Sequence, residues 1–219
     1  MPKQPDPEVR VRLVEAAARL LAIEGRPAVS ARRLAREVGA STQALYTHFD
    51  GMDDLLAEVW REGFRRFGHA LDAPRRTADP VADWMVQGWG YLDFARRDRH
   101  LYQVMFGDGM EGVRTGDPAD MEAAAGTFQS LLGRIEACVG AGRWLVDDVF
   151  TAGEVVWGAT HGQAMIVLAG YFEGVGRDAE ATYGEVLRRL SLGFGDDAEA
   201  TRRSLRAARR RAGRELASA

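Results

Sequence analysis

The spacing of the apolar residues constrains the fold of this chain more than any other feature. In the first segment Val9, Leu13 and Leu20 recur at the period of an α helix, and the pattern stops before Gly25. Side chains at this spacing share one face of a helix. Later segments repeat the pattern between glycine and proline breaks, and none alternates as a half-buried strand does. The sequence therefore predicts an all-α protein.

Start and stop signals divide the pattern into separate helices. Asp6 and Pro7 offer an N-cap acceptor and a first-turn proline, and Ser30 and Ser41 are N-cap residues for the next two helices. We predict helices over residues 7–24, 31–38, 42–48, 52–71, 80–95, 100–106, 118–140, 147–173 and 179–194, with a loop over 107–116. The first three form a small N-terminal unit, and the others form a larger body.

Composition narrows the class of protein. The chain is 46% hydrophobic and 28% charged, values that are ordinary for a globular protein. Its single cysteine, Cys138, excludes an internal disulfide framework and a multi-cysteine metal site. No apolar run approaches the roughly 20 residues of a membrane span, and the N-terminus has no hydrophobic signal segment. We therefore expect a cytoplasmic protein without a membrane partner.

The net charge of −3 is unevenly distributed along the chain. Residues 1–49 carry eight Lys and Arg against five Asp and Glu, and residues 199–219 carry seven against two. Residues 50–198 carry 14 against 25. Because DNA attracts cationic segments and repels acidic ones, the charge pattern allows nucleic acid at the two ends of the chain. It does not establish such binding by itself.

Residues 31–48 have the form of a helix-turn-helix, with two short helices joined by a three-residue turn that contains Gly39. Glycine adopts a positive φ at such a turn without steric cost. Burial of Leu34, Val38 and Leu45 would set the angle between the helices and direct the polar face of the second helix outward. That face carries Thr42, Gln43, Tyr46, Thr47 and His48. An ordinary helical hairpin with a polar exterior remains the alternative from spacing alone.

The segment from Val29 to Leu56 resembles the signature of the TetR family of transcriptional regulators. The matching residues are Leu34-Ala35, Gly39, Ser41, Leu45-Tyr46, His48-Phe49 and Leu55-Leu56. The resemblance extends from about Val9 to Val59. It implies a homodimer with one DNA-reading head per protomer and a C-terminal domain that binds a small molecule. The expected domains are a helix-turn-helix domain over 1–52, a ligand-binding and dimerisation domain over 53–198, and an arginine-rich tail over 199–219.

The resemblance also assigns roles on the reading head. Thr42 and Gln43 occupy the positions that meet bases, and Tyr46 and His48 occupy positions that bond phosphates. Gln43 is the strongest candidate for base discrimination because its amide can pair with adenine through two hydrogen bonds. The expected DNA-contacting residues are Ser30, Arg32, Arg33, Thr42, Gln43, Tyr46, Thr47 and His48.

Some residues of this segment could have a purely structural role instead of contacting DNA. Tyr46 and Phe49 are also candidates for the core, and His48 for a helix C-terminal cap. Family members usually carry a lysine where this chain has Met52. The resemblance therefore implies that one phosphate contact is missing, which would weaken binding without changing sequence preference.

Aromatic residues gather in the body, above all between residues 80 and 106. Such a cluster is more often core than binding site, although aromatic walls with a few polar groups also suit a ligand cavity. For a pocket we expect Trp84, Tyr91, Met105, Phe106, Phe128, Trp157 and His161, which suit an apolar or aromatic effector. The runs 100–107 and 156–165 are similar to a TetR subfamily with a Trp…His-Gly motif, which does not identify a ligand.

Two sequence features of the later helices indicate a dimer surface. Gly158 and Gly162 form a small-x-x-x-small pair that permits close helix approach, and an apolar stripe follows on the helix over 179–194. The expected interface residues are Gly158, Gly162, Tyr183, Leu187, Leu190 and Phe194. Packing of these residues within one chain is the alternative.

These observations favour a ligand-responsive regulator, most often a repressor, that binds a pseudo-palindromic DNA operator. The chain shows no nucleophile elbow, phosphate loop or metal-ligand spacing, so we expect no catalytic residue, metal or cofactor. The alternative is a helical small-molecule-binding protein or enzyme without operator binding. The acidic body disfavours a sequence-neutral DNA binder, and the tail reads best as a solvated charged helix.

Overall fold

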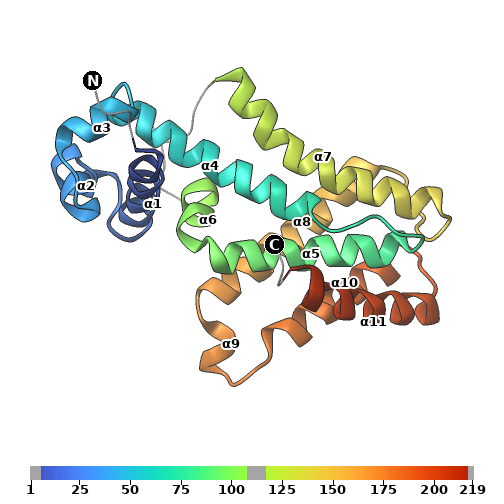
Figure 1. Ribbon diagram of the computed structural model, residues 1–219. Coiled ribbons are helices and arrows are strands. Elements are labelled where there is room, and N and C mark those ends of the chain that lie inside the picture. Colours follow the sequence, from blue (N-terminus) through green and yellow to red (C-terminus); the bar gives the residue numbers. More distant parts are fainter. Residues whose placement is uncertain (1–5, 108–116, 217–219) are drawn as a thin grey trace. The chain divides into compact units, whose positions relative to one another are not determined.

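The computed structural model describes residues 6–107 and 117–216, which form α helices and one short 3₁₀ helix without a strand (Figure 1). The all-α class is thus confirmed. The elements are α1 (Pro7–Glu24), η1 (Arg26–Ala28), α2 (Ala31–Val38), α3 (Thr42–His48), α4 (Met52–Asp72), α5 (Pro80–Arg97), α6 (Arg99–Phe106), α7 (Pro118–Gly140), α8 (Val149–Leu168), α9 (Tyr171–Gly174), α10 (Ala179–Gly193) and α11 (Ala198–Glu215). The loop predicted over 107–116 lies, from residue 108 onward, outside the described residues.

One predicted helix is interrupted. The single helix expected over 147–173 is divided into α8 and the one-turn helix α9, because Gly170 between them adopts a φ of +73°. This left-handed conformation ends an α helix and is readily accessible to glycine. Within the described residues no helix is both long enough and apolar enough to cross a membrane.

The chain divides into two compact units, Met1–Arg66 with Asp98–Ala123 and Phe67–Arg97 with Ala124–Ala219. These divisions differ from the boundaries expected at residues 52 and 198. The reason is packing between distant segments, since α6 packs on α1 in the first unit and α11 packs on α5 in the second. Both α4 and α7 contribute residues to both units.

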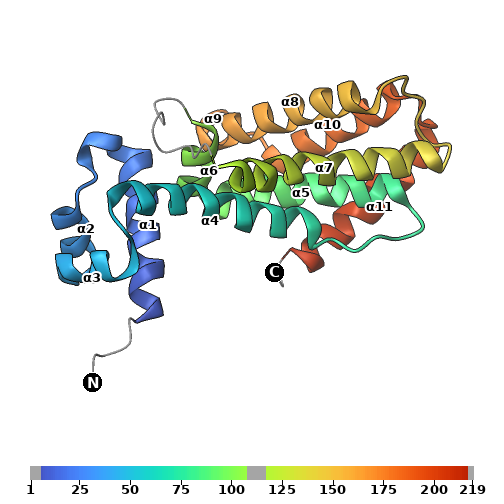
Figure 2. The ribbon, with the colours of Figure 1, turned by 90° about the horizontal axis from the view of Figure 1, so that it is seen from above.

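The first unit has one hydrophobic core. Leu13 of α1, Leu34 of α2 and Leu45 of α3 have no exposed surface, and Leu101 of α6 completes this cluster. Met52, the first residue of α4, packs against it as a partly buried side chain. Figure 2 shows α2 and α3 together on one side of α1. The core thereby holds the two helices of the predicted helix-turn-helix against a single scaffold helix.

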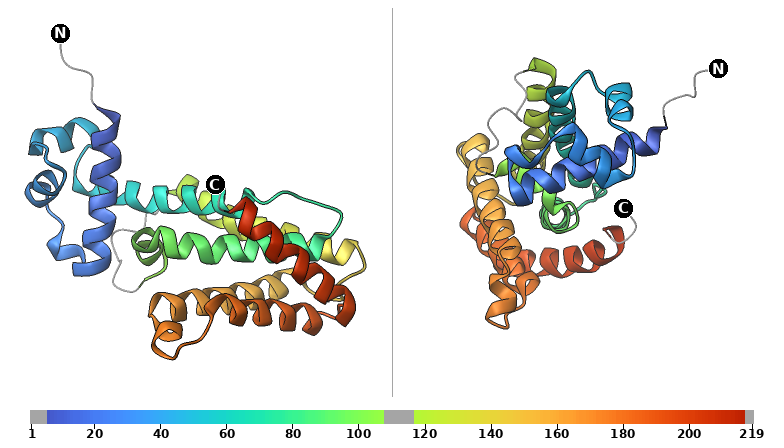
Figure 3. Two further views of the ribbon diagram at one scale, coloured as in Figure 1. Left: turned by 60° about the horizontal axis from the view of Figure 1, so that its bottom comes forward. Right: turned by 90° about the vertical axis from the view of Figure 1, so that its left-hand side faces the viewer.

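The second unit is built around α5, most of whose side chains are buried. Helices α8, α10 and α11 all pack on α5, and α8 and α10 run side by side (Figure 2). Figure 3 shows α11 crossing the other helices of this unit obliquely. Because α5 is covered on several sides, its sequence shows little of the polar face expected of a surface helix.

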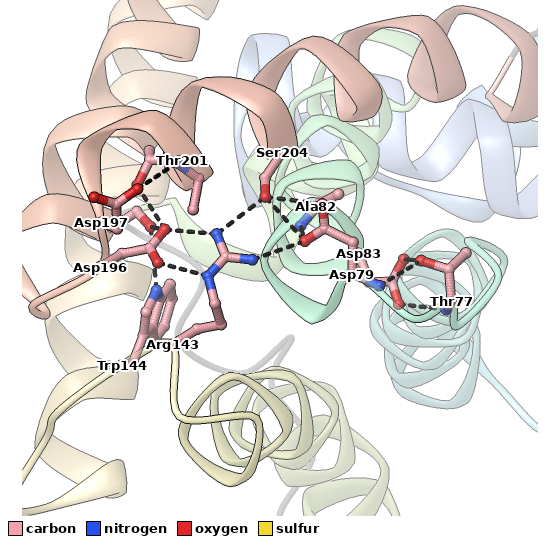
Figure 4. Close-up of polar contacts among 12 residues, drawn as sticks. Thr77, Asp79, Ala82, Asp83, Arg143, Trp144, Asp196, Asp197, Thr201 and Ser204 are labelled. Atoms are coloured by element: carbon pink, nitrogen blue, oxygen red, sulfur yellow. Dashed lines mark hydrogen bonds and ion pairs between the residues drawn. The ribbon is translucent and has the colours of Figure 1, made fainter.

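A polar network fixes the beginning of α11 (Figure 4). The guanidinium of Arg143 donates to both carboxylate oxygens of Asp196, at 2.6 and 2.8 Å. The hydroxyl of Ser204 in α11 donates to Asp79, just before α5, at 2.8 Å. Ser204 is buried, as are Thr201 and other residues on the inner face of α11. The prediction of a solvated tail helix is therefore wrong, because α11 buries one face against α5.

Candidate DNA-binding surface and effector site

The helix-turn-helix is formed by local signals that the structure shows directly. Gly39 adopts a φ of +67° in the left-handed region, as expected for the sharp turn after α2. The hydroxyl of Ser41 then accepts a hydrogen bond from the backbone N–H of Ala44 at 3.2 Å and caps α3. The turn ends one helix and begins the next within three residues, so α3 starts from a fixed position on the core.

The outer face of α3 is exposed as predicted. Thr42, Gln43 and Thr47 are exposed, and Tyr46 keeps 54% of its surface accessible. Tyr46 is therefore not a core residue, whereas Phe49 is, with 3% exposed. The face consists of hydrogen-bonding side chains on a short projecting helix, which is the form that enters a DNA major groove.

Two residues of this face have contacts of their own. The hydroxyl of Thr47 donates to the backbone oxygen of Gln43 at 2.9 Å, which orders Thr47 within the helix. His48 is half-buried in the last turn of α3, and its ring centroid lies 6.4 Å from that of Phe49. DNA contact by Thr47 and His48 stays a prediction.

The start of α2 adds polar and cationic groups. The hydroxyl of Ser30 accepts from the N–H of Arg33 at 3.4 Å. Arg33 itself donates twice to Glu24, at 2.8 and 2.6 Å, so much of its charge is balanced within the protein. Arg32 is exposed, and no carboxylate of the described residues pairs with it. Of the two predicted arginines, Arg32 is thus the one available to a phosphate.

Sequence reasoning missed a further cation on α2. Arg36 is exposed and lies one helical turn after Arg32, on the same face. Its spacing of four residues from Arg32 was the signal that could have identified it. At Met52 the structure supplies a packing role in place of the family's usual lysine, and the effect on DNA affinity stays a prediction.

Four of the seven expected effector residues lie in contact in the second unit. The hydroxyl of Tyr91 in α5 lies 3.1 Å from Nδ1 of His161 in α8. The ring of His161 is 6.0 Å from that of Trp157, which in turn is 6.2 Å from Phe128 of α7. Burial lowers the pKa of His161 below its ordinary value of 6.5. At neutral pH the cluster therefore presents an uncharged imidazole among aromatic rings.

The other three expected effector residues have different surroundings. Trp84 is 1% exposed and packs edge to face on Trp144, with ring centroids 4.8 Å apart. Met105 and Phe106 belong to the first unit. There Met105 packs over Gly63, where a Cβ would lie 2.7 Å from its sulfur. The assignment of all seven to one pocket stays a prediction.

Sequence reasoning missed two polar pairs in the second unit, one buried and one partly buried. The hydroxyl of Tyr183 donates to Oγ1 of Thr160 at 3.1 Å, and the amide of Gln87 donates to the hydroxyl of Ser130 at 2.9 Å. Polar residues inside strongly apolar helical segments were the available signal. No group of three or more metal-ligating side chains occurs in the part of the chain that the structure describes.

The expected dimer residues separate into two groups. Tyr183 and Leu187 have no exposed surface, so their assignment to an interface is corrected: they pack inside the protomer. Leu190 and Phe194 are half-buried, and the Phe194 ring lies 4.8 Å from that of Trp144. Tyr183 and Leu187 therefore follow the alternative of packing within one chain, and an interface role for Leu190 and Phe194 stays a prediction.

Helix α8 does present an apolar surface around the two glycines. Beyond the backbone of α8 itself, no atom of the described residues lies within 4 Å of a Cβ position at Gly158 or Gly162. Val155, Met165 and Ile166 on the same face keep 48%, 43% and 44% of their surface accessible. Exposed apolar side chains gathered in this way mark an interaction surface. Sequence reasoning had included the glycines of this surface but not its large side chains.

Two protein-family models match the chain. Residues 13–59 match the model of bacterial regulatory proteins of the tetR family, and residues 84–190 match the model of the tetracyclin repressor-like C-terminal domain. No curated protein matches the chain. The C-terminal match does not test the resemblance to a subfamily with a Trp…His-Gly motif.

Solved structures share the fold. A protein of unknown function from Rhodococcus sp. RHA1 is 23% identical with a TM-score of 0.72, and the match covers 86% of this chain and 96% of that one. A bacterial regulatory protein in the tetR family from Rhodococcus RHA1 is 18% identical with a TM-score of 0.71, covering 87% and 98%. RolR in complex with resorcinol is 16% identical with a TM-score of 0.56, covering 91% and 93%.

The two family models together span the helix-turn-helix and most of the helical body. The first model matches the segment that contains α3, and the second matches the part of the body that contains the aromatic cluster. This chain belongs to the TetR family of ligand-responsive, DNA-binding transcriptional regulators.

Proposed function

We propose that the protein is a repressor that binds a pseudo-palindromic operator as a homodimer and leaves it when a small apolar or aromatic effector binds. The observation that carries the proposal is the exposed polar face of α3, held on a buried core by Leu34 and Leu45. A regulator acting on a bacterial operator works in the cytoplasm. We assign reading of DNA to residues 1–52 and the remaining functions to the helical body.

Specific binding would rest on two kinds of contact. Gln43 and Thr42 stand at the start of α3, where the residues of a recognition helix reach base edges. Tyr46, Arg32 and the N-terminus of α2 at Ser30 would bond phosphates, which position the helix without reading sequence.

The exposed apolar face of α8 supports the homodimer. A two-fold axis beside Gly158 and Gly162 would pair this face with its copy and remove Val155 and Ile166 from water. In a two-fold dimer the two recognition helices reach half-sites about 34 Å apart, or one turn of DNA, and so read a pseudo-palindrome.

The aromatic cluster supports an effector of apolar or aromatic character. Phe128 and Trp157 offer flat apolar surfaces, and the neutral Tyr91–His161 pair offers hydrogen bonds without a net charge. RolR, a structural relative, forms a complex with resorcinol. The effector would act through its difference in affinity for two conformations of the dimer, and α4, with residues in both units, is the element that joins the two functions.

A footprinting experiment tests the proposal. The protein is incubated with DNA that flanks its own gene, and a protected pseudo-palindrome is expected at low salt. Gln43→Ala should weaken binding to this site by about 1–3 kcal/mol and relax its sequence preference at one position in each half-site. The matched control is Gln129→Ala, an exposed glutamine on α7, which should bind as wild type does.

The same variant distinguishes the alternative class. If the protein were a helical small-molecule-binding protein or an enzyme, no palindrome would be protected and Gln43→Ala would change nothing relevant. The family consists of transcription regulators, and we propose that this member has no catalytic activity.

A further inference from the structure

A groove opens in the second unit between α5, α10 and α11. Its volume is about 670 Å³, within the roughly 300–1,000 Å³ range of small-molecule sites. Trp89, Leu92, Ala212 and Leu216 supply its apolar lining, and the first two are almost fully buried. None of the residues expected for the effector site lines this groove. It is therefore a second, separate candidate site.

The rim of the groove is charged, and most of its charges are matched. Its charged lining residues are Asp93, Arg96, Arg97, Asp178, Glu180 and Arg209. Arg96 pairs with Glu180 at 2.7 Å, and Arg97 pairs with Asp93. Asp178 accepts from the backbone N–H groups of Glu180 and Ala181 and so caps α10. These pairs leave the guanidinium of Arg209 as the rim group without a partner among the described residues.

Packing holds Arg209 at this position. A Cβ at Gly184 of α10 would lie 2.4 Å from Nη2 of Arg209 and 3.2 Å from its Cζ. The guanidinium therefore occupies the space that any other side chain at residue 184 would take. Gly184 is buried in the interior of a helix, where glycine is otherwise unfavourable. The result is a cation placed against α10 beside an apolar floor, with no carboxylate of the described residues bound to it.

We propose that this groove binds a small amphiphilic carboxylate, separate from the effector that controls DNA binding. The apolar part of the ligand would lie against Leu216 and Ala181, above the nearly buried Trp89 and Leu92. Its carboxylate would take two parallel hydrogen bonds from the guanidinium of Arg209, the geometry that arginine offers to carboxylates. A cationic amphiphile of the same length would be repelled, and a neutral one would leave the guanidinium donors unmatched.

The test uses octanoate as the probe and the full chain as the protein. Titration calorimetry should show binding of octanoate, and octan-1-ol, which has the same chain without the charge, should bind at least tenfold more weakly because charge-assisted hydrogen bonds are the stronger kind. Leucine methyl NMR signals locate the site, because octanoate in this groove should shift the signals of Leu92 and Leu216. Binding at the aromatic cluster should instead shift Leu132, which lies beside Phe128 at Gly153.

Two matched variants separate the specific cation from general charge. Arg209→Gln should weaken octanoate binding about tenfold. Arg210→Gln removes the same charge from the next position of α11, which is exposed and does not line the groove, and should bind as wild type does. Circular dichroism verifies that both variants keep their helix content.

Several results would overturn the proposal: no binding of octanoate, equal binding of octan-1-ol, equal losses in the two variants, or shifts confined to Leu132. DNA binding is not needed for any of these measurements. A failed footprint would therefore leave this proposal standing, and a failed titration would leave the regulator proposal standing.

Discussion

The carboxylate of Asp196 shows how much a single residue contributes to the second unit. Its side chain is 1% exposed and accepts hydrogen bonds from Arg143, Ser191 and Thr201. Burial alone would raise the pKa of Asp196, but the hydrogen bonds and the charge of Arg143 outweigh it and hold the pKa below its ordinary value of 3.8. A carboxyl group with a lowered pKa in the folded state stabilises the protein above its unfolded pKa and loses this contribution as the pH falls.

We therefore expect Asp196→Asn to lower the free energy of unfolding at pH 7 by about 3 kcal/mol, because it leaves the partly buried charge of Arg143 with only its longer, 3.4 Å pairing to Asp79. The difference from wild type should shrink as the pH falls below 3.8, where the wild-type carboxylate takes up its proton. Urea unfolding at several pH values measures both effects. Glu199→Gln, at an exposed ion pair, is the control and should change little. A pH-independent difference would contradict this account.

The two neighbouring arginines of α2 give a prediction for DNA binding. Arg32→Gln should weaken DNA binding at all sequences and reduce the slope of log affinity against log salt by about one, because a free guanidinium that contacts a phosphate displaces a counterion. Arg33→Gln should have a smaller effect on the slope, since Arg33 already pairs with Glu24. Fluorescence anisotropy at several salt concentrations measures both slopes. Equal slopes for the two variants would show that the pairing with Glu24 does not persist on DNA.

At the scale of elements, the turn between α2 and α3 depends on one backbone conformation. Gly39 has a φ of +67°, and nothing lies within 4 Å of a Cβ placed there. Gly39→Ala should therefore destabilise the protein by about 1–2 kcal/mol through backbone strain alone. Gly126 in α7 also has open space around its Cβ position but lies within a helix.

Gly126→Ala should consequently stabilise the protein by about 0.5–1 kcal/mol, the opposite sign. Thermal unfolding of the two variants compares a left-handed glycine with a helical one under the same conditions. Because Gly39 also sets the position of α3, its alanine variant should lose operator affinity as well. A stable Gly39→Ala protein with full affinity would show that the turn tolerates other geometries.

At the scale of the whole molecule, the apolar face of α8 carries the proposed dimer. Ile166 is 44% exposed in the single chain, and a glutamate there would have to be buried without a partner in the dimer. Ile166→Glu should therefore shift the protein from dimer to monomer and abolish cooperative operator binding. Sedimentation velocity measures the assembly state. Ile23→Glu, at a 62% exposed position of the first unit, should remain dimeric, and a monomeric wild type at micromolar concentration would refute the interface.

The fold class, the limits of α1, α2 and α3, and the outward face of the recognition helix could be predicted from the sequence. Helix caps and tight turns act on residues close to them in the sequence, so their effect can be predicted from a short segment. This holds for the caps at Asp6, Ser30 and Ser41 and for the turn at Gly39. The exposed face of α3 follows from the same local register. For these features a helical period and a few capping residues were sufficient.

Only the tertiary structure decided which faces of the later helices are buried. Tyr183 and Leu187 form an apolar stripe that suits a partner chain or this chain equally well, and contact with α5 and α8 places it inside. The arginines of α11 suggested a solvated helix, yet Ser204 bonds Asp79, which is 125 residues away in the sequence. The groove at Arg209 is likewise formed by residues of three helices that come together only in the folded protein. Local sequence signals determine where a helix begins and ends and which residues share a face. Which of its faces is buried depends on the helices, distant in the sequence, that pack against it.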